Sequence, residues 1–208
     1  HKEYRRQRQM CIRDSIRRNQ LSDFTNIRQN GKIAMKLNEN DELVSVIPCC
    51  DKDNILLATK LGKAIRFDVN DVRVFVGRDS SGVRGIRLKP NDTVVSMSLL
   101  PDVEKRFVLS VTENGFGKRT PVEDYRMTNR GGQGVANIEC SVRNGPVVAS
   151  YVTSEENQIM LVTNSGKLIR IRVHGGEGDS IRIAGRKTQG VRLFDVDEGE
   201  KVVSVALL

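Results

Sequence analysis

The hydrophobic pattern of this chain is typical of short β-strands throughout. Brief apolar runs, many of them β-branched or alternating with polar residues, are separated by turns that contain glycine. Half-buried strands have this pattern, and tight turns between strands need the positive φ that glycine adopts without strain. No segment of about eleven residues or more shows the 3.6-residue period of an amphipathic helix. We therefore predict a nearly all-β protein.

Four similar segments divide the chain into repeats. In each segment, here called a box, a basic residue is followed by small or polar positions, a glycine and an apolar strand. The boxes lie near residues 28–33, 78–83, 129–135 and 186–191. Their strand-starting glycines, which are 51, 52 and 56 residues apart, are Gly31, Gly82, Gly134 and Gly190. Spacing of this kind indicates an array of similar supersecondary units.

Each unit also contains a hairpin and a further strand. The predicted hairpins turn at residues 60–62, 113–115 and 164–166, each turn ending in glycine. The further strands lie at residues 43–47, 94–98, 147–151 and 202–206. With the box strand this makes four strands per unit, and four-stranded units repeated radially are propeller-like blades. We expect about four such blades over residues 16–208, after a flank over residues 1–15 that is too polar for a buried strand.

The charge of the chain favours a polyanionic partner. Lys and Arg number 34 against 26 Asp and Glu, which gives a net charge of +8. Aromatic residues make up only 4% of the chain and Trp is absent, which argues against stacking on unpaired bases. Duplex nucleic acid is the better fit. Because the boxes and hairpins are basic and the turns after the boxes are acidic, we also expect a basic rim and a more acidic opposite side.

The sequence shows no pattern typical of a membrane span or of a metal site. No apolar run approaches the roughly 18 residues of a membrane span, and no apolar signal core follows the basic start of the chain. We expect a cytoplasmic protein without membrane contact. The cysteines, Cys11, Cys49, Cys50 and Cys140, do not have metal-binding spacing, and only two histidines accompany them. Buried thiols and no metal site are expected.

The third box and several other segments resemble a known family. Residues 129–134, Asn-Arg-Gly-Gly-Gln-Gly, are similar to the Q-R-R-G-G-K-G signature of the C-terminal DNA-wrapping domain of bacterial DNA gyrase A. Residues 71–86, 113–119 and 182–191 are similar to successive blades of that domain. The resemblance covers residues 16–208 and implies a β-pinwheel of four-stranded blades. Since the signature is incomplete and the family usually has six blades, the chain corresponds to a fragment of gyrase A.

The resemblance implies a function in DNA topology. The pinwheel would bind and bend duplex DNA without reading its sequence, supporting ATP-dependent negative supercoiling together with gyrase B and the remainder of gyrase A at the nucleoid. ATP and Mg²⁺ belong to that holoenzyme, and we expect no cofactor and no catalytic residue in this fragment of a type II topoisomerase. Two alternatives remain open. They are the equivalent domain of topoisomerase IV and a protein-binding propeller.

The candidate DNA contacts are the basic residues of the boxes and hairpins. Glycine-rich backbone lets N–H donors approach a phosphate, and Arg grips two phosphate oxygens at once. A solvated surface role is the alternative for each of them. The predicted contacts are Arg28, Lys32, Lys63, Arg66, Arg78, Arg84, Arg87, Lys118, Arg119, Arg130, Lys167, Arg170, Arg186, Lys187 and Arg192. The glycines predicted to form the box turns are Gly31, Gly82, Gly131, Gly132, Gly134 and Gly190.

Overall fold

The computed structural model describes residues 7–27, 29–37, 39, 41–77, 80–100, 106–175 and 180–208. Within these ranges the chain forms strands and three short 3-10 helices, with no α-helix, so the prediction of a nearly all-β protein is confirmed. The 3-10 helices are η1 (Leu21–Phe24), η2 (Val69–Asp71) and η3 (Val122–Asp124). Two predicted DNA contacts, Arg28 and Arg78, lie outside the described residues.

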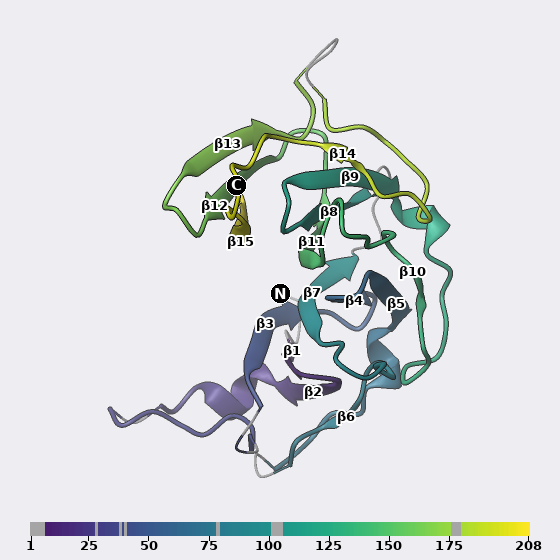
Figure 1. Ribbon diagram of the computed structural model, residues 1–208. Coiled ribbons are helices and arrows are strands. Elements are labelled where there is room, and N and C mark those ends of the chain that lie inside the picture. Colours follow the sequence, from purple (N-terminus) through teal and green to yellow (C-terminus); the bar gives the residue numbers. More distant parts are fainter. Residues whose placement is uncertain are drawn as a thin grey trace.

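Four sheets follow one another around a C-shaped body (Figure 1), and the predicted number of blades is confirmed. Blade 1 has the strand order β3 (Leu43–Cys49), β1 (Gln7–Ile12), β2 (Ser15–Gln20) and β6 (Val83–Arg84). Blade 2 has the order β7 (Val94–Leu100), β4 (Asn54–Thr59), β5 (Lys63–Asp68) and β10 (Val135–Ala136). Blade 3 has the order β11 (Val147–Thr153), β8 (Phe107–Thr112), β9 (Phe116–Pro121) and β14 (Val191–Arg192). Blade 4 has the order β15 (Val202–Leu207), β12 (Gln158–Thr163) and β13 (Leu168–Arg172).

Each box strand pairs with the blade that precedes its own unit. The antiparallel pairs are β6 with β2, β10 with β5 and β14 with β9. After the box strand, the chain returns to the blade of its own unit and forms the inner strand of that blade. One example is β7, which pairs with β4. The paired part of each box strand is only two residues long, shorter than the apolar pattern predicts. In Figure 1, β6, β10 and β14 lie along the convex side of the C.

The prediction of a flank over residues 1–15 is wrong for Gln7–Ile12. These residues form β1, which pairs antiparallel with β2 on one edge and with β3 on the other. Such a central strand is held by its backbone N–H and C=O groups, which a polar sequence supplies as well as an apolar one. The apolar pattern alone therefore missed it. Residues 1–6 lie outside the described part of the chain.

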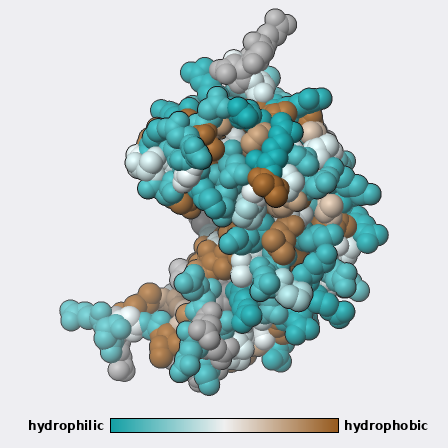
Figure 2. All heavy atoms as spheres, viewed as in Figure 1, coloured by the Kyte–Doolittle hydropathy of each residue, from teal (hydrophilic) through white to brown (hydrophobic). Residues whose placement is uncertain are grey.

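Blade 4 differs from the other three. It has three strands, and no described residue pairs with the outer edge of β13. The prediction of four-stranded blades is therefore wrong for this blade, although the fourth unit supplies four strands, because its box strand β14 pairs with blade 3. Figure 1 shows blade 4 at one end of the C and blade 1 at the other, and the space-filling surface in Figure 2 is hollowed between them.

The core consists of apolar layers between neighbouring blades. Because side chains alternate along a strand, β4 contributes to two layers, with Leu57 packed towards blade 1 and Leu56 towards blade 3. A third layer joins blades 3 and 4 through residues such as Leu109 and Leu161. Tyr125 is buried in the middle layer and donates a hydrogen bond from Oη to Asn137 Oδ1 at 2.6 Å. Stacked blades thus stabilise one another through shared apolar faces.

Candidate nucleic-acid interface

The segments that carry the boxes cross from one blade to the preceding blade in the same way three times. Each crossing makes an isolated bridge to a recurring arginine of the preceding blade, and the bridges are Arg18 to Val74, Arg66 to Met127 and Arg119 to Ile183. The next residue along donates its N–H to the carbonyl of that arginine, for example Thr128 to Arg66 at 2.9 Å. The convex rim is therefore built from equivalent crossings.

Three box glycines, Gly82, Gly134 and Gly190, allow the close approach of these crossings to the blades. Gly134 has a φ of +69°, and a Cβ atom there would lie 2.4 Å from the Ala64 carbonyl oxygen. Only glycine fits such a position without a shift of the backbone. Positive φ also occurs at Gly31, Gly82, Gly131 and Gly190, whereas Gly132 is not among the positive-φ glycines.

The box arginines fasten neighbouring boxes to each other. Arg130 donates from Nε to the Asp71 carbonyl at 2.8 Å and from an Nη to the Arg84 carbonyl at 3.1 Å. Arg186 donates in the same manner to the Ala136 carbonyl at 3.1 Å. Both residues are half-buried, and protein carbonyls hold their guanidinium groups. They join successive box strands into one continuous rim.

Two predicted contacts, Lys118 and Arg119, lie inside the molecule. Lys118 is completely buried and donates to the Gly185 carbonyl at 2.5 Å. Burial, together with the nearby charge of Arg186, lowers the pKa of Lys118 to about 8. Arg119 is 3% exposed, donates from Nε to the Ile181 carbonyl at 2.6 Å, and burial lowers its pKa. We therefore remove both residues from the candidate surface.

Arg119 belongs to a position that is arginine in all four blades. The other members are Arg18, Arg66 and Arg170. Arg66 is half-buried and donates to the Val122 and Tyr125 carbonyls at 3.4 and 3.3 Å. On blades 2 and 3 this arginine holds the incoming backbone, whereas Arg18 on blade 1 donates to the Asp51 and Asn70 side chains. Arg170 lies on the uncovered edge of blade 4, where it is exposed and donates to Gln158 Oε1 at 2.6 Å.

The acidic turns pair with several predicted contacts. Lys167 lies 2.5 Å from Asp197 and 2.8 Å from Glu200, and Arg192 lies 2.5 Å from Asp195. The expected separation of basic and acidic residues onto opposite faces is wrong here, because the turn after the box folds back onto the basic residues. The pKa of Glu200 is lowered by the Asp197 backbone N–H first, and then by hydrogen bonds from Lys167 and two hydroxyl groups.

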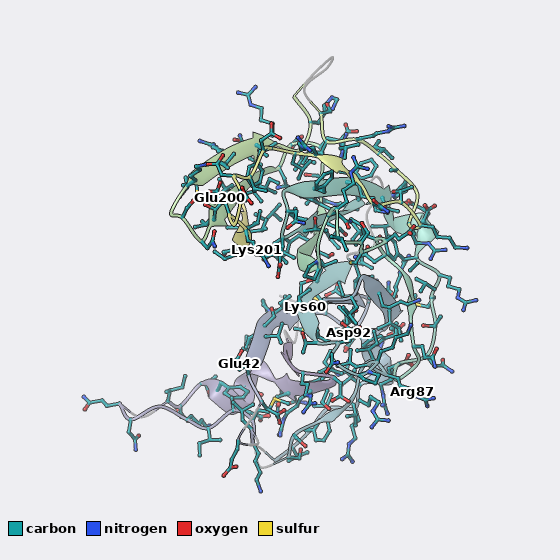
Figure 3. All side chains as sticks on the ribbon, in the orientation of Figure 1. Glu42, Lys60, Arg87, Asp92, Glu200 and Lys201 are labelled. Atoms are coloured by element: carbon teal, nitrogen blue, oxygen red, sulfur yellow. The ribbon has the colours of Figure 1, made fainter. Side chains whose placement is uncertain are left out.

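Among the described residues, six members of the predicted set are exposed. They are Arg84, Arg87, Lys167, Arg170, Lys187 and Arg192. The half-buried members are Lys32, Lys63, Arg66, Arg130 and Arg186. Arg84 and Arg87 line an open groove of about 730 Å³ beside blade 1 that also contains acidic side chains. Figure 3 shows Arg87 on the convex side, whereas Lys60 and Lys201 lie beside the notch of the C.

Three exposed arginines on the crossings were not among the predicted contacts. Arg73, Arg126 and Arg182 each follow a buried apolar residue and precede the bridge residue. The sequence contains a signal for them, because an alignment of the units brings Val72-Arg73, Tyr125-Arg126 and Ile181-Arg182 to one position.

Within the described residues, no group of three His, Cys, Asp or Glu side chains could hold a metal ion, and no helix could span a membrane.

Blades in radial order, with each outer strand supplied by the next unit, define a propeller-like repeat domain. A family profile described as DNA gyrase C-terminal domain, beta-propeller, matches residues 15–50, 53–101, 106–145 and 157–208. The match covers more than half of the sequence, and the chain therefore belongs to the DNA gyrase C-terminal domain family.

Individual relatives agree with this assignment. The DNA gyrase A protein of Rickettsia felis is 41% identical over 240 residues, a match that covers 93% of this chain and 26% of the relative. The chain thus spans about a quarter of the length of that relative. A solved DNA gyrase A C-terminal domain has a TM-score of 0.83 at 27% identity, covering 97% of this chain and 65% of that one. A solved C-terminal domain of DNA topoisomerase IV has a TM-score of 0.89 at 24% identity, covering 99% and 62%, and shares the fold.

Proposed function

We propose that this chain binds duplex DNA along its convex rim and bends it, without reading the base sequence. The observation that carries the proposal is the repetition of equivalent basic crossings on the outside of consecutive blades. The net charge of +8 and the family membership support it. The proposed contacts from the boxes and hairpins are Arg84, Arg87, Arg170 and Lys187.

Bending follows from the shape of the rim. A straight duplex touches only part of a convex surface, so further contacts require the DNA to curve. Bending 20 to 30 base pairs by 40 to 90° costs about 1 to 6 kcal/mol. Contacts to phosphates offset this cost, and they carry no direct sequence information. The same charges on several blades would therefore favour a bent duplex of any sequence.

We further propose that the domain acts as part of a gyrase A protein. Negative supercoiling by the holoenzyme would use ATP and Mg²⁺ bound elsewhere, together with gyrase B and the rest of gyrase A, in the bacterial cytoplasm at the nucleoid. The equivalent role in topoisomerase IV is the second candidate, because the fold matches that domain with a TM-score of 0.89. The gyrase role is favoured because the relative with 41% sequence identity is a gyrase A protein.

Salt-titrated binding to two unrelated duplexes tests the proposal, with end-labels that report bending by energy transfer. If six to ten phosphates are contacted, affinity should fall on the order of 10³ to 10⁵-fold between 50 and 200 mM salt. The double variant Arg87→Ala with Lys187→Ala should lower the salt slope by up to about 2 for both duplexes. A flat salt dependence, or binding without a change in end-to-end distance, would overturn the proposal and favour a protein partner.

A further inference from the structure

The three crossings present an arginine row that is distinct from the boxes and hairpins. Arg73, Arg126 and Arg182 occupy the same position in units 2, 3 and 4, each one residue before its bridge to the preceding blade. The backbone on both sides of each arginine is therefore fixed in the same way. Equivalent backbone on equivalent blades places the three side chains on the same side of the body.

The side chains of this row are directed outward by the alternation of an extended segment. The residues immediately before them, Val72, Tyr125 and Ile181, are buried with exposures of 0%, 1% and 4%. The arginines themselves are exposed. Each crossing thus uses its apolar side chain to anchor in the interblade core and turns the following guanidinium to solvent.

The row also differs in its partners from the exposed cations that form ion pairs. Lys167, Arg192 and Lys201 form ion pairs at 2.5 to 3.0 Å with neighbouring carboxylates. Among the ion pairs of the described residues, none involves Arg73, Arg126 or Arg182. Arg73 stacks over Phe75 at 4.4 Å. A polyanion that approaches this side would not first have to displace a bound carboxylate.

We propose that Arg73, Arg126 and Arg182 form a second phosphate-contacting row, which sets the path of the DNA from blade to blade. This inference rests on the proposed DNA-binding function. The box arginines Arg130 and Arg186 are engaged in fastening the rim, so they define its shape, whereas the crossing arginines supply charge at each step along it. One crossing arginine on each of blades 1, 2 and 3 gives a regular series of contacts along a curved backbone.

The test compares two double variants that remove the same charge. Arg126→Ala with Arg182→Ala removes two members of the row, and Lys60→Ala with Lys201→Ala removes two exposed cations beside the notch. Arg73 stays in place because its loss would also remove the contact with Phe75. Binding to one duplex is titrated with salt, and thermal unfolding is measured for each protein. A third variant, Arg126→Lys with Arg182→Lys, keeps the charge.

The row variant should lower the salt slope by about 1.8, so that its affinity loss between 50 and 200 mM salt is about 12-fold smaller than that of the wild type. The notch variant and the lysine variant should keep most of the wild-type slope. If the wild type binds and bends DNA but the row variant keeps the wild-type slope, the row does not contact phosphates, while the proposed function stands. If the wild type does not bind, both fail. Equal losses in the row and notch variants would indicate diffuse attraction and also overturn the row.

Discussion

The hairpins of blades 3 and 4 have nearly the same sequence pattern, but the outer edges of these two blades lie in different environments. Arg119 follows Gly115 by four residues, and Arg170 follows Gly166 by four residues. Arg119 is 3% exposed and holds the Ile181 carbonyl, whereas Arg170 is exposed. The cause is the next unit, because the crossing and β14 cover β9 while no described residue pairs with the outer edge of β13.

Neighbouring units therefore determine what a residue of the repeat contacts. On the covered edges of blades 2 and 3, the arginine satisfies backbone carbonyls of the incoming crossing and stabilises the joint between units. On an uncovered edge, the same arginine is a surface cation. The hairpin glycines follow the same rule, since their surroundings change with the cover while their φ does not. The first two experiments each change a residue on a covered edge and its counterpart on blade 4, and the third changes a residue of blade 4 alone.

The largest difference is expected at the hairpin glycines Gly62 and Gly166. Their φ values are +80° and +85°, so an alanine at either site carries backbone strain of about 1 to 3 kcal/mol. At Gly62 a Cβ atom would also lie 2.1 Å from the Ile138 carbonyl oxygen, whereas nothing lies within 4 Å at Gly166. Gly62→Ala should therefore lower the free energy of unfolding by about 1 to 3 kcal/mol more than Gly166→Ala does. Urea unfolding measures both.

Circular dichroism at low urea shows whether each alanine variant starts from the native sheet content. Gly134→Ala serves as a second covered site, because a Cβ atom there would lie 2.4 Å from the Ala64 carbonyl oxygen. It should resemble Gly62→Ala. If Gly62→Ala and Gly166→Ala lost equal stability, the cover by the next unit would have no energetic consequence at the turn.

The paired arginines should give opposite results in stability and in DNA binding. Arg119→Ala leaves the Ile181 carbonyl without its donor and should cost about 1 to 3 kcal/mol of unfolding free energy. Arg170→Ala on the uncovered edge should change stability by no more than about 0.5 kcal/mol. Under the proposed function, Arg170→Ala should lower the salt slope of DNA binding by about 1, and Arg119→Ala should leave it unchanged.

Thermal unfolding and salt-titrated binding are measured on the same preparations. Arg170→Lys is the matched control for charge, because it keeps the cation on the same edge and should keep the slope. A loss of slope with Arg119→Ala in a fully folded protein would mean that the buried arginine reaches DNA, contrary to the comparison. An unchanged slope with Arg170→Ala would remove blade 4 from the proposed contact surface.

The parts of the fold that depend on local chemistry could be predicted from the sequence. Alternating apolar runs indicated the strands, and glycines such as Gly62 and Gly115 marked hairpins because their positive φ is a local requirement. The spacing of the boxes gave the number of blades. The polar strand β1 was missed, since its pairing on both edges uses backbone groups that the apolar pattern does not report.

The site was harder to predict because burial is decided between units. Lys118 and Arg119 lie in a basic hairpin that looks, in sequence, like a surface hairpin, and only the crossing of the next unit buries them. The pairing of a box strand with the preceding blade is likewise non-local. The exposed arginines Arg73, Arg126 and Arg182 were predictable in principle, because the apolar residue before each one recurs in the aligned units.

The turn beside the uncovered hairpin of blade 4 is held by a carboxylate. Glu200 is 7% exposed and accepts hydrogen bonds from Thr163 Oγ1 at 2.6 Å, from Ser165 Oγ and from Lys167 Nζ at 2.8 Å. In blade 3 the turn beside the covered hairpin is held instead by an amide, because Asn144 accepts from the Ser141 N–H at 2.8 Å. Only the first of these two turns depends on an ionised group.

The smallest change in stability is therefore expected when the pH is lowered, and it should occur in the turn of blade 4 that Glu200 holds. The pKa of Glu200 is lowered from its ordinary value of 4.5, so its ionised form stabilises the folded state above that value and this contribution is lost as the pH falls below it. Glu200→Gln should be less stable than the wild type at pH 7, and the difference in melting temperature should narrow at about pH 3. Amide hydrogen exchange should report the loosening in β12 and β15, with β8 and β9 as the internal control. A difference in melting temperature that is the same at both pH values would show that the charge of Glu200 does not hold this turn.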